Sequence, residues 1–321
     1  MGNSMFITVL ICTRDRAASL RATLTSLFCQ TEAAALDWEI IVVYGPTGNG
    51  ETAALCREFQ ATYPSRLRFF VETRPGKSNF LNTGIAASRG KIIALTDDDV
   101  LCAPDYIESI RAVFNLYPAD GVQGRILLDC EGGWPKWMDH EMAAFMSLRD
   151  LGDDAMEWND NLAGTNMVLR REVIQNLGGF APEVGASASG FMEDSEFSLR
   201  MRRMGCRLIY APQIIVRHQV PRCRLTKSFF RERYFRWGRS EAYLSPLPSS
   251  LWRYGLYMAK ELALREAQAL LYLCAGQHAR ALRLQCHARR NAGFFWQYWL
   301  FRLGHSRKLT SPKILLPGMD Q

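Results

Sequence analysis

Residues 91–100 read KIIALTDDDV, an apolar run that ends in three consecutive aspartates. A short apolar run of this kind predicts a strand buried on both faces, as in the middle of a parallel sheet. Ligands of such sheets bind at the carboxyl ends of the strands, so we expect Asp97, Asp98 and Asp99 at a ligand-binding edge. Alternation along the strand places Asp97 and Asp99 on one face.

Two carboxylates on one face repel each other unless a cation lies between them. A Mg²⁺ or Mn²⁺ ion held by one or two carboxylates, and completed by substrate phosphates, would satisfy this arrangement. The other interpretation is a helix cap, because a helix is expected to begin near Pro104 and aspartate is a favoured cap residue. A cap uses one aspartate and this strand has three, which favours the cation site.

Strands and helices alternate on both sides of this stretch. The alternation predicts an α/β domain with a mainly parallel, Rossmann-like sheet and helices on both faces. Residues 131–162, which have no clean period, are expected to form a long excursion or lid. The expected strands are residues 6–12, 39–43, 67–72, 92–95 and 166–169 with a strand pair in 207–216, and the expected helices are 19–28, 51–62, 78–88 and 193–204.

A second acidic motif lies in residues 190–205, GFMEDSEFSLRMRRMG. Glu193 and Asp194 open a helix whose buried face carries Phe197 and Met201. Acidic residues in a first turn also compensate the helix dipole, so this motif alone does not distinguish a site from an ordinary helix start. Glycine-rich stretches on its N-terminal side allow the close approach of a ligand or a mobile loop.

Taken in order, these motifs resemble the family 2 glycosyltransferases with the GT-A fold, over roughly two-thirds of the chain. The resemblance implies a catalytic domain over residues 1–218, followed by a basic helical region over residues 219–321. The matching segments are TRDR (13–16), EIIVV (39–43), GKSNFLNTGIAASRG (76–90), DDD (97–99), GTNMVLRREVIQNLGGF (164–180), ED-x-E-F-x-x-R (193–200) and P-x-x-x-V-x-H (212–218).

The family resemblance implies an activity and a cofactor. The chain is expected to move a sugar, with inversion, from a nucleotide-diphosphate sugar to an acceptor hydroxyl in bacterial surface-glycan or glycolipid biosynthesis, with Mn²⁺ or Mg²⁺ bound. Two alternatives remain: a nucleotidyltransferase on a related sheet, and an inactive binding module of GT-A shape. The first usually carries a G-x-G-T-R signature where this chain has TRDRAAS, and retention of Asp97, Asp99 and Asp194 argues against the second.

The resemblance also implies roles for single residues. Asp99 would ligate the cation that bridges the donor diphosphate, and His218 falls where several GT-A enzymes supply a further metal ligand. Asp194 would be the general base, with Glu193 as the alternative. On the donor side we expect Thr13, Arg14, Tyr44, Lys77, Asp97 and Asp98, and on the acceptor side Glu193, Gly178, Gly179 and Trp134.

Two positions depart from the family pattern. Tyr44 stands where family members commonly have an aspartate that holds the nucleotide; it could stack on the base instead, so the base is not assigned. Chain-elongating relatives carry Q-x-x-R-W, whereas this chain has Arg233, Arg236 and Trp237 in that pattern. No run of about 18 apolar residues is present to form a membrane channel, so processive synthesis is not expected.

The charge is unevenly distributed. Between Arg222 and Thr310 there are 17 Lys or Arg and four acidic residues, a local charge of +13, so the remainder carries −6. Because no nucleic-acid module is recognisable, we expect no nucleic-acid partner. An ordinary helical cap and a basic surface on an anionic membrane are the other two interpretations; aromatic residues beside cations in 294–308 favour the membrane. Its expected contacts are Phe294, Phe295 and Trp296 with Arg231, Arg236 and Arg239.

Cysteine usage and the N-terminal segment bear on localisation. The chain has nine cysteines, an odd number, and none in a C-x-x-C pair, which fits a reducing cytosol. The N-terminal segment does not resemble a signal peptide. We therefore expect a cytoplasmic protein, peripheral at the inner face of the cell membrane if the basic region binds lipid, with a glycan or lipid-linked acceptor.

Overall fold

The computed structural model describes residues 6–31, 37–46, 50–185, 190–245 and 248–305. The chain divides into two compact units, and each contains more than one segment of the sequence. The first unit is Met1–Asp129, Met146–Pro182 and Glu193–Gln219; the second is Cys130–Phe145, Glu183–Met192 and Val220–Gln321.

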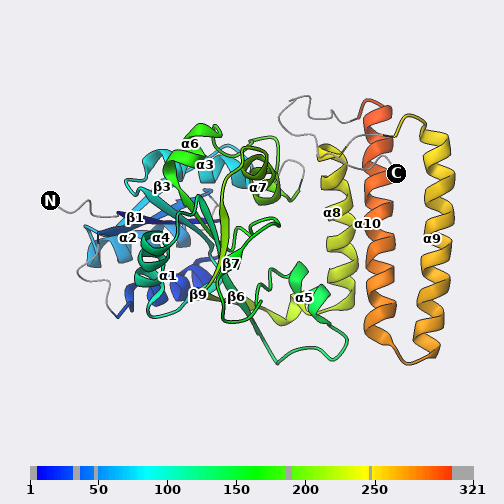
Figure 1. Ribbon diagram of the computed structural model, residues 1–321, viewed down its shortest axis with the longest axis horizontal. Coiled ribbons are helices and arrows are strands. Elements are labelled where there is room, and N and C mark those ends of the chain that lie inside the picture. The colour runs from blue at the N-terminus through cyan, green and yellow to red at the C-terminus, as the bar shows by residue number, and fades with distance from the viewer. Residues whose placement is uncertain (1–5, 32–36, 47–49, 186–189, 246–247, 306–321) are drawn as a thin grey trace. The chain divides into compact units, whose positions relative to one another are not determined.

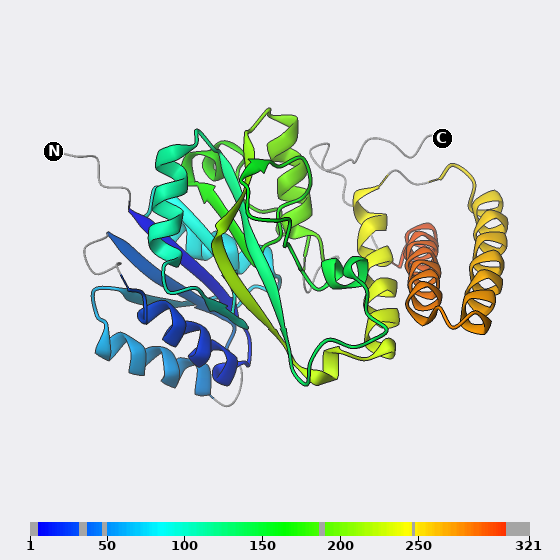
Figure 2. The ribbon, with the colours of Figure 1, turned by 60° about the horizontal axis from the view of Figure 1, so that its bottom comes forward.

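A nine-stranded mixed sheet forms the centre of the first unit, in the order β3-β2-β1-β4-β8-β6-β9-β5, with β7 paired to β9 (Figures 1 and 2). Strands β1 to β4 are parallel, β8 is antiparallel to β4 and to β6, and β9 is antiparallel to β5 and β7. The strands are β1 Ile7–Thr13, β2 Trp38–Tyr44, β3 Leu67–Val71, β4 Ile92–Asp97, β5 Val100–Cys102, β6 Gly121–Cys130, β7 Met156–Glu157, β8 Asn166–Arg170 and β9 Leu208–Val220.

Helices cover both faces of the sheet, because the strands bury side chains on both sides (Figure 1). Ile7, Val9 and Ile11 of β1 pack in one core with α1, α2 and α4, whereas Leu10 packs in the other with α3, α6 and α7. This alternation has the period of two that a strand imposes. The helices are α1 Ala17–Phe28, α2 Glu51–Thr62, α3 Lys77–Ala87, α4 Tyr106–Leu116, α6 Arg171–Asn176 and α7 Glu193–Arg203.

The expected α/β class is confirmed, and the part of the sheet from β3 to β4 is parallel as the sequence predicts. Three local expectations were wrong. Residues 207–216 do not form a strand pair; they belong to one strand, β9, which continues to Val220. Residues 121–130 form β6, which the sequence analysis did not anticipate. Residues 131–162 are not one excursion, since 130–145 belong to the second unit and 146–162 to the first.

The second unit is built on three long helices, α8 Lys227–Leu244, α9 Leu251–Cys274 and α10 His278–Arg302, joined by the short helix α5 His140–Phe145 and the 3₁₀ turn Arg222–Arg224. The backbones of α8 and α10 touch where they cross. A Cβ atom on Gly238 would lie 1.8 Å from the carbonyl oxygen of Arg290, and one on Gly293 would lie 2.0 Å from that of Phe235. Only glycine, which has no Cβ, permits this approach.

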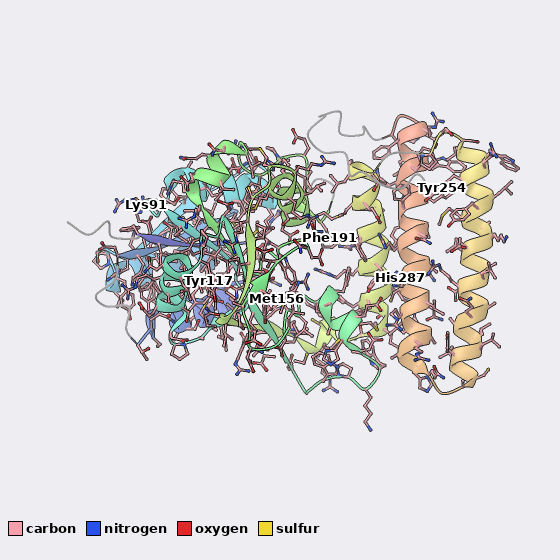
Figure 3. The ribbon with its side chains drawn as sticks, viewed as in Figure 1. Lys91, Tyr117, Met156, Phe191, Tyr254 and His287 are labelled. Atoms are coloured by element: carbon pink, nitrogen blue, oxygen red, sulfur yellow. The ribbon has the colours of Figure 1, made fainter. Side chains whose placement is uncertain are left out.

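The side chains expected to face a membrane are largely used within this unit. Phe294 is buried and Phe295 half-buried, and both pack against Tyr254 of α9. Tyr254 is labelled in Figure 3. Arg231 and Arg239 donate hydrogen bonds to Gln285 and Gln297 of α10. Of the six side chains that the sequence predicts to contact a membrane, Trp296 and Arg236 are exposed. Arg236 forms an ion pair with Glu232. Within the described residues, no helix is long and apolar enough to cross a bilayer.

Candidate active site

The three aspartates lie at the carboxyl end of β4, next to the end of β1. Strand β4 ends at Asp97, which pairs with Cys12 of β1, and Asp98 and Asp99 form a turn before β5. The strand therefore does not continue far enough to put Asp97 and Asp99 on one face by alternation. The Asp99 carboxylate lies beside β9 instead, where its Oδ1 is 3.5 Å from His218 Nε2.

The turn after β1 binds this aspartate turn. Thr13 Oγ1 donates to Asp98 Oδ2 at 2.5 Å, and Arg16 Nη1 donates to Asp98 Oδ1 at 2.6 Å and to Asp99 Oδ2 at 2.9 Å. Asp15 has a φ of 55°, a left-handed conformation that aspartate tolerates better than most residues, and this turns the chain so that Arg16 points back. Sequence reasoning assigned Thr13 and Arg14 and missed Arg16, although it belongs to the same TRDR motif.

His218 is held beside Asp99 by its place on β9. It pairs with Val100 of β5, and the Gln219 amide donates to the Asp99 carbonyl oxygen at 2.8 Å. The His218 Nδ1 lies 3.0 Å from the Met146 carbonyl oxygen, and Nε2 lies 3.5 Å from Asp99 Oδ1. A carbonyl oxygen can only accept, so Nδ1 carries the hydrogen; Nε2 faces Asp99, as a donor when the ring is protonated or as a cation ligand when the ring is neutral.

Lys77, the first residue of α3, bridges two acidic segments that are far apart in the sequence. Its Nζ lies 2.8 Å from Asp97 Oδ1 and 3.5 Å from Glu193 Oε1. Asp97 Oδ2 accepts a further hydrogen bond of 2.7 Å from Thr165 Oγ1, a residue that sequence reasoning also missed. Through Lys77 the start of α7 is joined to the end of β4.

Asp194 is the more accessible of the two acids that open α7. Its Oδ2 accepts from the Gly164 amide at 3.0 Å and its Oδ1 from the Ser195 amide at 2.8 Å. Asp194 is half-exposed, whereas Glu193 is buried with its carboxylate near Lys77. A general base must be accessible to the acceptor hydroxyl that it deprotonates, which favours Asp194 over Glu193 for that role.

Burial and neighbouring charges raise the pKa of some groups in this cluster and lower the pKa of another. Burial raises the pKa of Glu193 despite Lys77, with Asp194 adding to the effect, and burial likewise raises the pKa of Asp98 against Arg16. Burial would also raise the pKa of Asp97, but Lys77 and Thr165 hold it well below its ordinary value. Burial would lower the pKa of His218, but Asp99 and Asp97 raise it.

Asp99 and His218 form the best pair of ligands for a divalent cation. Within the described residues, no group of three or more His, Cys, Asp or Glu side chains could hold an ion alone. Two ligands about 2.1 Å from one ion lie about 3 Å apart at a right angle, so the 3.5 Å between Asp99 Oδ1 and His218 Nε2 needs only a small adjustment. The Nδ1–H bond to a carbonyl is the usual outer contact of a metal-ligating histidine. The residues thus fit a cation whose remaining ligands come from phosphate and water.

The other expected site residues have contacts of their own. Tyr44 and the exposed Arg14 are at the same strand edge, where the Thr13 carbonyl accepts from the Gly45 amide; the Tyr44 ring packs beside Phe69. Gly178 and Gly179 follow α6 with φ of 75° and 76°, and the Gly179 carbonyl oxygen accepts a hydrogen bond from Arg200 of α7. Trp134 belongs to the second unit, where its indole donates to the Met138 carbonyl oxygen.

Glu72 fixes the loop that leads from β3 to Lys77. Its carboxylate accepts hydrogen bonds from the backbone and guanidinium of Arg74 and from Thr83 on α3. The guanidinium bonds of Arg74 lower the pKa of Glu72 to about 2, against the opposing effect of burial.

A lowered carboxyl pKa gives a stability that is present above the unfolded value and is lost as pH falls through the folded value. We therefore expect Glu72→Gln to lower the melting temperature at pH 7, with the difference from the wild type shrinking between about pH 4.5 and pH 2. Thermal unfolding of both proteins across this range measures the effect. A difference that does not change with pH would contradict the ionic role of Glu72.

The family of the chain follows from its comparison with known proteins. The chain belongs to the glycosyltransferase-like family 2, whose model matches residues 4–240. It is 24% identical to the glucosyl-dolichyl phosphate glucuronosyltransferase of Haloferax volcanii, over 67% of this chain and 70% of that protein. It is 26% identical to the probable glycosyltransferase YdaM of Bacillus subtilis, over 64% of this chain and 48% of that protein.

Two solved structures share the fold. The mannosyltransferase PcManGT from Pyrobaculum calidifontis, in complex with GDP-Man and Mn²⁺, matches with a TM-score of 0.61 at 21% identity, over 94% of this chain and 88% of that chain. GalNAc-T7 with UDP, GalNAc and Mn²⁺ matches with a TM-score of 0.54 at 16% identity, over 76% of this chain and 50% of that chain. The GT-A fold expected from the sequence is thereby confirmed.

Proposed function

We propose that this protein transfers a sugar, with inversion, from a nucleoside diphosphate sugar to an acceptor hydroxyl. The observation that carries the proposal is the joining of two carboxylate segments at one sheet edge: Lys77 lies between Asp97 of the strand end and Glu193 at the start of α7. One segment suits a cation and a diphosphate, and the other supplies an accessible base. The two similar structures hold GDP-Man or UDP together with Mn²⁺, which supports this assignment.

The donor diphosphate is expected over the aspartate turn. Five carboxylates lie around Lys77 and Arg16, so the cluster carries more negative charge than its two cations neutralise. Asp99 and His218 would hold Mn²⁺ or Mg²⁺, which supplies electrostatic stabilisation of the charge that develops on the leaving diphosphate. Arg14 is exposed at the same edge, so it is accessible to an approaching phosphate.

Asp194 is the proposed base. Two amide hydrogen bonds fix its carboxylate, and its half-exposed position leaves it accessible to an acceptor hydroxyl. The ionised carboxylate is the form that accepts a proton. One carboxylate is enough for a single displacement, in which the acceptor attacks from the side opposite the leaving group.

A surface glycan or a lipid-linked glycan is the proposed acceptor class. The support is the similarity to a protein named for its action on glucosyl-dolichyl phosphate, a lipid-linked sugar. The proposed place of action is the cytoplasmic face of the cell membrane.

A screen of nucleoside diphosphate sugars with Mn²⁺ and with Mg²⁺ tests the function. We expect one donor to raise the melting temperature in a metal-dependent way and to release its nucleoside diphosphate slowly in water. Release of pyrophosphate from a nucleoside triphosphate would instead identify a nucleotidyltransferase. Stabilisation by donors without any turnover would identify a binding module. Once an acceptor is known, the anomeric configuration of the product tests inversion.

A further inference from the structure

The outer side of α9 is an exposed apolar surface. Of the 16 large apolar side chains that are exposed in the described residues, nine are on α9 and α10, and a tenth, Leu303, directly follows α10. Seven of them lie on α9 between Trp252 and Leu273, with Trp252 75% exposed and Leu271 71% exposed. Soluble proteins rarely leave large apolar side chains contiguous on one surface unless that surface binds something.

Among the described residues of the unit, only one side of α9 is packed against a neighbouring helix. Helix α9 packs on α10 with its opposite side, where Met258 and Ala269 are buried and Tyr254 contacts Phe294 and Tyr298. Figure 1 shows α9 and α10 side by side and antiparallel. Within the part of the chain that the structure describes, the outer side of α9 is therefore exposed.

Helix α10 extends the surface at one end. Trp296, Trp299 and Leu303 are exposed there, and the Phe295 ring packs edge-on against Trp299 while lying beside Gly255 of α9. Because the two helices are antiparallel, Trp252 at the start of α9 lies at the same end as these residues. Tryptophan is the side chain most enriched where hydrocarbon meets lipid headgroups.

Cations border the apolar side chains. Arg253 and Lys260 are exposed on α9, and neither has an ion-pair partner recorded within the described residues. Helices α8, α9 and α10 together contain 13 Lys or Arg and four Glu, and α10 contains no acidic residue. The net charge of +9 on these helices is complementary to anionic lipid.

We infer that the outer side of α9, with Trp296 and Trp299 of α10 and the adjoining Leu303, lies on an anionic membrane surface. The apolar side chains enter the boundary between headgroups and acyl chains, and Arg253 and Lys260 bind the headgroup phosphates, as in other interfacial helices. The aromatic contacts named from sequence, Phe294 and Phe295, are inside the unit instead. The inference does not depend on the proposed function, because membrane binding needs neither donor nor acceptor.

A second copy of the chain is the main competing occupant. Ala259, Ala263 and Ala267 lie in line with Trp252 and Leu270 at helical spacing, and small residues permit close helix pairing. Pairing of two copies would bring two units of charge +9 together, whereas an anionic bilayer attracts that charge. The charge therefore favours lipid.

Flotation of the full chain with vesicles tests the inference, without nucleotide or acceptor. We expect binding to vesicles of phosphatidylcholine with phosphatidylglycerol and little binding to phosphatidylcholine alone. Leu271→Gln should weaken binding roughly tenfold, since a leucine side chain loses its burial in lipid. The matched control is Leu116→Gln on α4, where Leu116 is 70% exposed; it should bind like the wild type.

Neutralising charge tests the second half of the inference. Arg253→Gln with Lys260→Gln should weaken binding roughly 30-fold, about fivefold for each cation. The matched control, Arg57→Gln with Arg89→Gln, removes two exposed cations from the first unit and should have no effect. Added salt should weaken wild-type binding and leave a smaller, salt-resistant part from the apolar contacts.

Two results would overturn the inference. The first is a wild-type protein that does not float with anionic vesicles at low salt. The second is a dimer in light scattering that Leu271→Gln dissociates while vesicle binding is unchanged, which would assign the surface to a second copy. Circular dichroism and thermal unfolding show whether each variant keeps its fold. The donor-binding screen is a separate measurement, so failure of the membrane proposal and failure of the proposed sugar transfer are distinguishable.

Discussion

Asp194→Asn is expected to lower the rate of sugar transfer by about 10²- to 10⁴-fold, the range that a positioned general base contributes. The asparagine oxygen can still accept the hydrogen bond from the Gly164 amide, whereas its NH₂ group cannot accept the one from the Ser195 amide, so the start of α7 keeps one of its two bonds. Donor affinity should change little, because the base acts on the acceptor proton alone. Steady-state kinetics with donor and acceptor varied separately would measure kcat and both KM values.

Asp129→Asn provides the control for Asp194→Asn, since Asp129 is exposed on β6 and the change in charge is the same. Near-normal turnover in Asp194→Asn would assign the base elsewhere. Glu193 is then the first alternative, and Glu193→Gln would be compared. Its burial and its proximity to Lys77 predict that this second change perturbs the fold more than the first.

The second large effect concerns the cation. Asp99→Asn should reduce the Mn²⁺-dependent part of nucleoside diphosphate binding by roughly 100-fold, because one of two proposed protein ligands loses its charge. Arg16 keeps its partner Asp98, so we expect the turn to persist. Calorimetric titration of the nucleoside diphosphate with and without Mn²⁺ measures both parts of the affinity.

His218→Ala should reduce the same part of the affinity, and the affinity without Mn²⁺ should be unchanged in both variants. The matched control is His278→Ala at the start of α10, where His278 is exposed. If the affinity for the nucleoside diphosphate depends on Mn²⁺ as in the wild type in both Asp99→Asn and His218→Ala, the assignment of the cation to these two residues is wrong.

The sequence was informative where structure is local or periodic. Buried strands such as residues 7–13 and 92–97 follow from uninterrupted apolar runs, and the order of strands and helices was enough to predict the parallel part of the sheet. The antiparallel part was harder, because β6 and β9 are long and only partly apolar. Their pairing is fixed by contacts between residues far apart in the chain, which periodicity does not report.

The candidate site shows the same contrast between local features, which sequence predicts, and contacts between distant residues, which it does not. Asp97, Asp98 and Asp99 could be located from sequence because parallel strands end at one edge. Arg16 and Thr165 could not be located from sequence. The contacts of Arg16 depend on a left-handed turn at Asp15, and those of Thr165 depend on the pairing of β4 with β8. The apolar surface was missed for a related reason: residues 294–301 are more aromatic than α9, but which of two packed helices keeps an exposed side is decided by their packing.

The glycine contact between α8 and α10 has an evolutionary consequence. Any side chain at Gly238 or Gly293 would push two backbones apart, so these positions have almost no freedom to change while the helices stay paired. The outer side of α9 has no such constraint, because exposed residues there can be exchanged without disturbing the crossing. Descendants of this chain could therefore diverge in the surface they bind while inheriting one unaltered pair of helices, and two small residues would be the part of the unit under the strongest purifying selection.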